Sequence, residues 1–207
     1  MTPTRVSALA AVYREGAIGN VGNVGNDGVA DAAPGIIIAE RCGLNLLVLR
    51  GAASDNNWVA AAQSAIAIAL PTTPGMAATT AACSALCLAA DEWLISGNAA
   101  SVGDLALNGG ARVDVSHGRT VLRLSGPRTR DLLAKGCSLD LHPSVFKAGH
   151  CAQTTLARIN VLIHLRNQDG AFDLYCPRSY ALSLWHWVTT SAAEFGYAVA
   201  APLWETP

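Results

Sequence analysis

The chain has 207 residues, of which 51% are hydrophobic and 14% charged, and its formal net charge is −1. This length allows one domain or two small ones, and the near-zero charge offers nucleic acid no electrostatic attraction. No apolar run reaches the roughly 20 residues of a membrane span, the N-terminus lacks a secretory pattern, and six cysteines are too few for a disulfide scaffold. We expect a cytoplasmic protein that binds neither nucleic acid nor membrane.

A glycine-rich run occupies residues 16–28 and reads GAIGNVGNVGNDG. It superficially resembles a dinucleotide-binding loop, but no strand precedes it and no helix follows it, as that loop requires. A segment of Gly and Asn buries too little apolar surface to offset the entropy lost on ordering. We expect residues 1–35 to form a flexible Gly-rich arm.

A first module is predicted over residues 36–116. Asp55 is a typical N-cap residue and Pro71 cannot continue a helix, so both ends of the first helix are marked. The expected elements are a strand over 44–50, a helix over 56–69, a hairpin with strands at 86–88 and 93–95, and a weaker helix over 101–107.

A second module is predicted over residues 117–207. Pro127 fits the first position of a helix, Ser179 is expected to cap the last helix, and Gly196 is expected to end it. The expected elements are a strand over 119–124, a helix over 127–135, a loop over 137–151, strands over 159–165 and 172–176, and a helix over 179–195.

Both modules therefore follow the order strand, helix, hairpin, helix. Gly51 and Gly126 end the two first strands, and their separation is close to that of Trp93 and Phe172, which begin the returning hairpin strands. Near-equal separations favour an internal duplication. The predicted fold class is α+β, built from two β-α-β-β-α modules close to the split-βαβ arrangement.

Possible reactive residues gather in the loop 137–151, which contains Cys137, His142, His150 and Cys151. Cys and His bind zinc, but adjacent residues seldom both turn to one ion and the specific C-x-x-C pair is missing. We interpret the loop as packing and predict no metal ligand, with a metal-binding redox module as an alternative.

Cys83 and Cys87 lie too far apart along one strand to share a ligand, and we expect both to be buried as small apolar side chains. Ser125 lacks the G-x-S-x-G context of a nucleophile and reads as a turn residue. His164 lies in a strand on the face opposite its apolar neighbours, so we expect it to be partly exposed or hydrogen-bonded. The sequence predicts no catalytic and no cofactor-binding residue.

The last helix carries apolar residues on more than one side. Leu184 and Trp187 fall outside the expected core stripe, and large aromatic residues are enriched at interface centres. We therefore propose Trp187 and Leu184 as candidate interface residues, with burial inside this chain as the alternative. The expected core stripe is Leu182, Trp185, Val188, Ala192 and Phe195.

A longer stretch of the second half of the chain resembles one known protein family. The stretch RTVLRLSGPRTRDLLAKGCSLDLHPSVFKAGHCAQTTLARINVLIHL (119–165), with FDLYCPRSYALSLWHWV (172–188), resembles the gamma subunits of heterotetrameric sarcosine oxidases. The most specific parts are LSGPR at 124–128, the segment 135–143 and CPRSY at 176–180, and DEWL at 91–94 is similar to the first hairpin of that family.

The resemblance implies a fold similar to the folate-binding domain of glycine-cleavage aminomethyltransferases. It implies a complex that demethylates sarcosine or a related N-methyl amine oxidatively to glycine, passes the one-carbon unit to tetrahydrofolate and releases hydrogen peroxide. In that family FAD, FMN, NAD, tetrahydrofolate and zinc belong to the alpha, beta and delta subunits, which would be the partners of this chain. The gamma subunit carries no known catalytic residue, so the chain is expected to be an assembly subunit.

One alternative stays open at this point, namely a free-standing folate-binding protein of the aminomethyltransferase or iron–sulfur assembly type. The assembly factors have a K-G-C-aromatic-x-G-Q-E signature. Residues 147–154 read KAGHCAQT and lack the Gly-Gln-Glu end.

Overall fold

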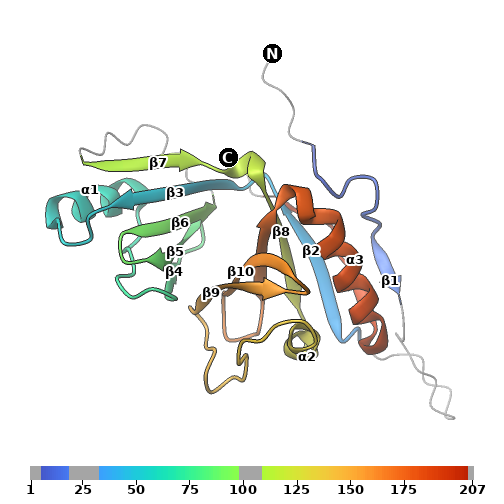
Figure 1. The fold of residues 1–207 in the computed structure, drawn as a ribbon. Helices are drawn as coiled ribbons and strands as arrows, with labels where there is room; N and C mark the ends of the chain where they lie inside the picture. The colour runs from blue at the N-terminus through green and yellow to red at the C-terminus, as the bar shows by residue number, and fades with distance from the viewer. Residues whose placement is uncertain (1–5, 19–32, 98–108, 205–207) are drawn as a thin grey trace, which may run out of the picture.

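Two β-sheets pack face to face, with helices on their outer sides (Figure 1). The computed structural model describes residues 6–18, 33–97 and 109–204. The eight-stranded sheet has the order β1-β12-β2-β8-β11-β10-β9, with β13 also pairing β2, and the five-stranded sheet has the order β4-β5-β6-β3-β7. Helices α2 and α3 pack on the larger sheet and α1 on the smaller one.

The strands are β1 (Gly16–Ile18), β2 (Ile36–Cys42), β3 (Asn45–Gly51), β4 (Ala77–Thr79), β5 (Cys83–Ala89), β6 (Glu92–Gly97), β7 (Gly110–Asp114), β8 (Arg119–Ser125), β9 (Cys151–Leu156), β10 (Ile159–Leu165), β11 (Phe172–Pro177), β12 (Tyr197–Val199) and β13 (Leu203–Trp204). The helices are α1 (Asn56–Ile66), α2 (Thr129–Ala134) and α3 (Ala181–Ala192), with short 3-10 helices η2 (Ser116–Gly118), η3 (Arg178–Tyr180) and η4 (Ala193–Phe195).

The first helix begins where the sequence predicts. The Asp55 carboxylate accepts hydrogen bonds from the backbone amides of Asn57 and Trp58, at 2.9 and 3.2 Å. The helix ends at Ile66, before the predicted residue 69, because Ala67 adopts a left-handed conformation. Its buried face carries Trp58, which stacks on Trp93 of β6 with ring centroids 5.6 Å apart.

The two sheets have matching strand orders, since β9-β10-β11-β8-β2 repeats the order β4-β5-β6-β3-β7. In this match β2 takes the place beside β8 that β7 takes beside β3, and both pairs are antiparallel. Strand β2 lies in the predicted first module but joins the sheet of the second module, whereas β7 stays in the sheet of the first module. Sheet membership thus differs from the predicted division into 36–116 and 117–207 at β2, because the chain passes from the larger sheet to the smaller one at Gly43 and returns to the larger one around η2.

A third hydrophobic cluster joins the sheets to each other. It contains Leu44, Leu46, Leu86 and Leu94 from the smaller sheet's side and Val121, Cys151, Leu162 and Tyr175 from the larger sheet. The buried Tyr175 hydroxyl also donates to the hydroxyl of Ser96 at 3.1 Å. Both faces of each sheet are therefore buried over much of their area, one by helices and one by the opposing sheet.

The first part of the expected flexible arm is ordered in the structure. Residues 6–18 pack on the body of the protein, Leu9 is fully buried, and β1 pairs with β12. The Tyr13 hydroxyl donates to the carbonyl of Ala200 at 2.6 Å, and its ring lies 5.1 Å from that of Trp185. Apolar contacts hold this segment in place, although its glycine content had predicted a flexible arm. Most of the glycine-rich run lies outside the described residues.

The buried face of α3 differs from the predicted core stripe. Leu182 is 53% exposed, whereas Leu184 is fully buried together with Ala181, Trp185, Val188 and Ala192. Ser179 does not cap this helix, because it lies within η3 and no side chain caps the N-terminus of α3.

Strand β9 begins at Cys151, the last residue of the expected loop, and continues over residues for which no element was predicted. The helix expected over 101–107 lies outside the described residues. Each helix in the described ranges is too short or too polar to cross a bilayer.

Gly97 at the end of β6 tests how tightly the smaller sheet is packed. Its φ is +143°, and an added Cβ would lie 2.3 Å from the carbonyl oxygen of Ala82. We expect Gly97→Ala to lower the free energy of unfolding by about 3 kcal/mol, through backbone strain and overpacking. Gly118→Ala is the control, because its Cβ would meet no described atom within 4 Å, and it should change stability by less than about 0.5 kcal/mol. Urea unfolding measures both, and equal losses would contradict this account.

Candidate functional site

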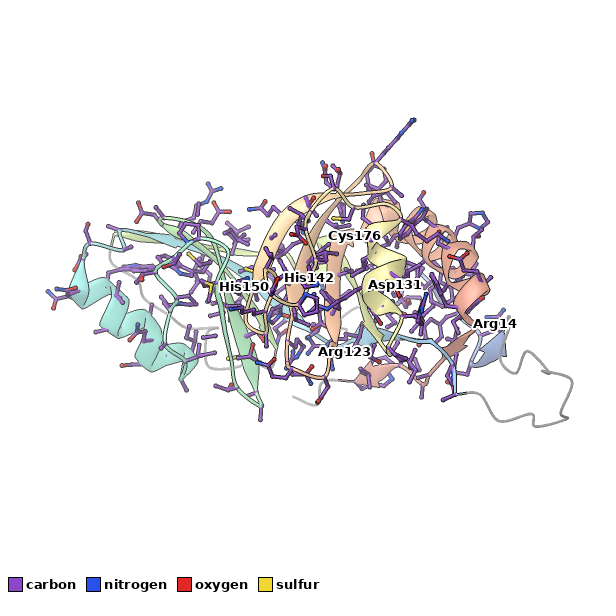
Figure 2. The ribbon with its side chains drawn as sticks, turned by 90° about the horizontal axis from the view of Figure 1, so that it is seen from below. Arg14, Arg123, Asp131, His142, His150 and Cys176 are labelled. Carbon is purple, nitrogen blue, oxygen red and sulfur yellow. The ribbon has the colours of Figure 1, made fainter. Side chains whose placement is uncertain are left out.

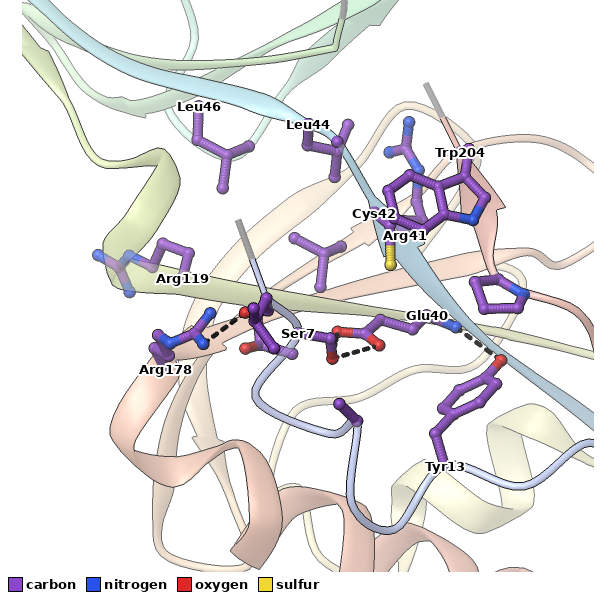
Figure 3. Close-up of a pocket in the computed structure, with 16 residues that line it drawn as sticks. Ser7, Tyr13, Glu40, Arg41, Cys42, Leu44, Leu46, Arg119, Arg178 and Trp204 are labelled. Carbon is purple, nitrogen blue, oxygen red and sulfur yellow. Dashed lines mark hydrogen bonds between the residues drawn. The ribbon is translucent and has the colours of Figure 1, made fainter. Parts of the chain in front are cut away.

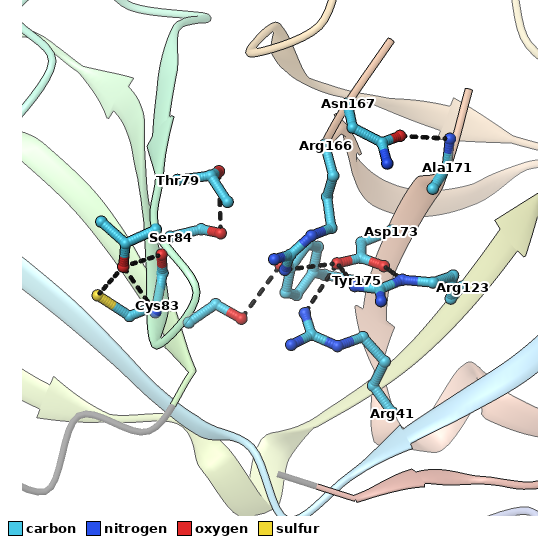
Figure 4. A network of polar contacts seen from close by, with 12 residues as sticks. Arg41, Thr79, Cys83, Ser84, Arg123, Arg166, Asn167, Ala171, Asp173 and Tyr175 are labelled. Carbon is cyan, nitrogen blue, oxygen red and sulfur yellow. Dashed lines mark hydrogen bonds and ion pairs between the residues drawn. The ribbon is translucent and has the colours of Figure 1, made fainter. Parts of the chain in front are cut away.

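The main buried polar site is a cluster of charged side chains around Asp173 on the inner face of the larger sheet (Figure 4). The Asp173 side chain has no exposed surface. Arg123 of β8 binds both of its oxygens, with Nε and Nη2 at 2.8 and 3.0 Å. Arg41 of β2 donates to it at 2.8 Å, and Arg166 lies 3.5 Å away. One carboxylate thus connects three guanidinium groups, two of them on neighbouring strands.

The positive charges decide the ionisation of this carboxyl group. Burial by itself would raise the pKa of Asp173, but the hydrogen bonds from Arg123 and the charges of Arg41 and Arg166 outweigh it and lower the pKa below its ordinary value. The carboxylate is therefore charged and fully engaged. Such a cluster holds strands together and has no free acid or base to offer to a substrate.

His164 lies beside this cluster, opposite Asp173 in the register of β10 and β11. It was expected to be partly exposed or hydrogen-bonded, but it is fully buried and neither ring nitrogen has a hydrogen-bond partner among the described residues. Burial lowers its pKa to about 4, against the attraction of Asp173 and with the help of the nearby arginines. The inner face of this strand is covered by the second sheet, which a single strand's alternation does not reveal.

A pocket of about 380 Å³ opens where the chain passes from β2 to β3 (Figure 3). Glu40 and Cys42 lie on its β2 side, and Leu44 and Leu46 on its β3 side. The N-terminal segment closes one wall through the Ser7 hydroxyl, which lies 2.7 Å from each carboxylate oxygen of Glu40. Arg119, Arg178 and Trp204 complete the rim.

The Cys and His residues of the loop 137–151 do not converge. The Sγ of Cys137 lies 3.8 Å from the hydroxyl of Thr154. The exposed His142, which is labelled in Figure 2, bonds through Nδ1 to Ser144. His150 packs edge-on against Phe146. Burial raises the pKa of Cys151 to about 12, so its thiol is not a nucleophile at neutral pH. Within the described ranges, no three His, Cys, Asp or Glu side chains are arranged to hold a metal ion.

The two candidate interface residues behave differently. Leu184 is fully buried in the core under α3, so its selection as an interface residue is wrong. Trp187 is half-buried, and a Cβ on Gly136 would come within 2.5 Å of its ring, so this ring packs over Gly136. Its role as an interface residue stays a prediction.

Comparison with known proteins places the fold. Residues 50–194 match the profile of the sarcosine oxidase gamma subunit family. The chain belongs to this family.

The gamma subunit of Corynebacterium sp. (strain U-96) sarcosine oxidase is 32% identical over 149 residues, which cover 69% of this chain and 72% of the relative. The gamma subunit from strain P-1 is 38% identical over 87 residues, or 42% of each chain.

The fold is also similar to those of solved structures. A chain of the heterotetrameric sarcosine oxidase from Corynebacterium sp. U-96, solved in complex with pyrrole 2-carboxylate, has a TM-score of 0.72 at 28% identity and covers 79% of this chain and 87% of its own. Aminomethyltransferase T of the glycine cleavage system from Bartonella henselae has a TM-score of 0.58 at 13% identity, covering 82% of this chain and 48% of its own. The second match concerns the fold alone, which agrees with the predicted aminomethyltransferase-like α+β architecture.

The buried carboxylate of this gamma-family chain gives a stability prediction. We expect Asp173→Asn to lower the free energy of unfolding by about 3–5 kcal/mol, because it leaves buried guanidinium groups without a counter-charge. Asp131→Asn is the matched control, since its ion pair with Arg128 is about half exposed and should contribute no more than about 1 kcal/mol. Thermal unfolding measures both, and a mild effect of Asp173→Asn would contradict the structural role.

His164 gives a pH prediction. Its pKa is about 4 in the folded chain and near 6.5 when unfolded, so between these values only the unfolded chain binds the proton. Stability should therefore fall as the pH drops from about 6.5 to 4, by on the order of 3 kcal/mol from this residue. In His164→Leu the difference from wild type should change across this window and be constant above pH 7. Curves of unfolding free energy against pH that run parallel for wild type and His164→Leu would refute this assignment to His164.

Proposed function

We propose that this chain is a non-catalytic assembly subunit of a heterotetrameric sarcosine oxidase. The observation that carries the proposal is the match to a chain of that complex over 87% of the relative's length, at a TM-score of 0.72. The chain's expected partners are the alpha, beta and delta subunits.

The interior supports a structural role. The arginines of the buried cluster bind Asp173, and the Tyr175 hydroxyl binds Ser96 on the opposing sheet. These groups stabilise strand pairing and sheet packing, and they do not fit a cofactor site because their hydrogen-bonding capacity serves one another. As the resemblance to the sarcosine oxidase family implies, we propose that FAD, FMN, NAD, tetrahydrofolate and zinc are held by the other three chains.

The surface supports docking. Only 14% of the residues are charged, well below the average of about 25%. Large apolar side chains stand more than half exposed on the isolated chain, and exposed apolar surface is typical of interaction sites. They include Val6, Val113, Tyr180, Leu182 and Trp204.

The complex proposed here demethylates sarcosine, or a related N-methyl amine, oxidatively to glycine. The one-carbon unit passes to tetrahydrofolate, and oxygen is reduced to hydrogen peroxide. This chain contributes shape and contact surface to that reaction, and its partners contribute the groups that react.

Co-expression with the three other chains tests the proposal. We expect the purified chain alone to have no sarcosine oxidase activity, and its omission to leave the other chains poorly assembled, as judged by native mass spectrometry and peroxide production. Turnover by the purified chain alone, or full assembly and activity without it, would contradict the proposal.

Calorimetry separates this function from that of a free-standing folate protein. We expect no heat of binding when tetrahydrofolate is titrated into the isolated chain, because the buried Asp173 carboxylate and Tyr175 hydroxyl are engaged internally. The assembled oxidase is the positive control. Tight binding by the isolated chain would favour the folate-binding alternative.

A further inference from the structure

The pocket between β2 and β3 has an unbalanced charge. Arg119 faces Pro177 in the register of β8 and β11, so Arg119 and Arg178 come from adjacent strand ends and lie together at one side of the pocket (Figure 3). Arg178 donates to the carbonyl of Val6 at 2.5 Å, whereas no side-chain hydrogen bond or ion pair within the described residues engages the Arg119 guanidinium. The pocket therefore offers a guanidinium group that is free to bind an anion.

The nearby carboxylate does not neutralise this end. Glu40 is only 6% exposed, and both of its oxygens lie 2.7 Å from the Ser7 hydroxyl. Figure 3 shows the Glu40 carboxylate directed toward Ser7, whereas the contact with the Tyr13 hydroxyl is made by the Glu40 backbone amide. No ion pair among the described residues joins Glu40 to Arg119 or Arg178, and arginine forks bind carboxylates bidentately.

The opposite side of the pocket is apolar. Figure 3 shows Leu44 and Leu46 on its floor and Trp204 at the other rim, and Val121 also lines the pocket. The Trp204 side chain is 68% exposed, the largest exposure among the large hydrophobic residues of the described chain. A pocket for a small molecule normally encloses its ligand with buried apolar walls. An indole left open to solvent beside arginines instead has the composition of an interface centre, where Trp and Arg carry most of the binding energy.

We propose that this pocket is the docking site for a segment of a partner chain that presents a large apolar side chain next to a carboxylate. The apolar side chain packs between Trp204 and the Leu44–Leu46 floor, and the carboxylate binds Arg119 and Arg178. The inference rests on the proposed function, because it assigns the surface through which this subunit joins its complex.

Binding of variants to the other three chains tests the pocket. Trp204→Ala should weaken association about 30-fold, the loss typical of a central anchor, and Arg119→Glu about tenfold. Val145→Ala and Arg158→Glu are matched controls, an exposed apolar residue and an exposed arginine that do not line the pocket. Both controls should bind within about twofold of wild type. Circular dichroism and thermal unfolding establish that every variant is folded.

Cys42 supplies a readout that needs no substitution. It lies on the pocket wall and is the one cysteine of the six that is not buried. In the wild-type chain alone a maleimide should modify Cys42 first, and in the assembled complex its rate should fall about tenfold or more, as in other contacts that exclude water. Mass spectrometry of peptides identifies the modified residue.

The outcomes separate the two proposals. If wild type does not associate with the other chains, the proposed function fails. If wild type associates while Trp204→Ala and Arg119→Glu bind equally well and Cys42 remains reactive, this docking site is refuted and the proposed function stands. If Trp204→Ala instead abolishes self-association of the isolated chain and leaves the complex intact, the occupant is a second copy and the proposal is likewise overturned.

Discussion

A single buried carboxylate fixes the arrangement of the larger sheet. Asp173 binds arginines from β2 and β8 with no exposure of its own. Without it, these guanidinium groups would stand uncompensated between two sheets, where charge is costly. Because β2 comes from the start of the chain and pairs with β8 of the second half, this ion cluster also connects the two halves.

The two sheets are joined by a strand that crosses from one module to the other and by an apolar cluster between them. Strand β2 of the first module joins the sheet of the second, and the apolar cluster around Tyr175 fills the space between the sheets. The crossing at Gly43 leaves the open pocket at the sheet junction, where the N-terminal segment and β13 meet. The same topology that stabilises the fold therefore creates the surface that we infer to contact a partner.

Local signals predicted most of the elements but not their pairing. Asp55 caps α1 as expected, and the strands β3, β6, β8, β10 and β11 fall where alternation or apolar runs indicated. Charges inside apolar strands, Arg123 and Asp173, were a signal for a buried ion pair, yet only the register of β8 and β11 shows that they face each other. Strand β9 and the docked N-terminal segment were missed, because short polar or glycine-flanked segments gain their stability from contacts distant in sequence.

The sequence by itself determined the family, the α+β class and the absence of a recognisable catalytic motif, because the family-like segments, the helix caps and the hydrophobic periods are local properties of the chain. Only the tertiary structure decided which sheet each strand joins, that Leu184 is inside and Leu182 outside, and that His164 is buried beside Asp173. The physical reason is that a side chain's surroundings depend on the second sheet and the helices packed against its strand, and these are brought there by contacts between residues far apart in the chain.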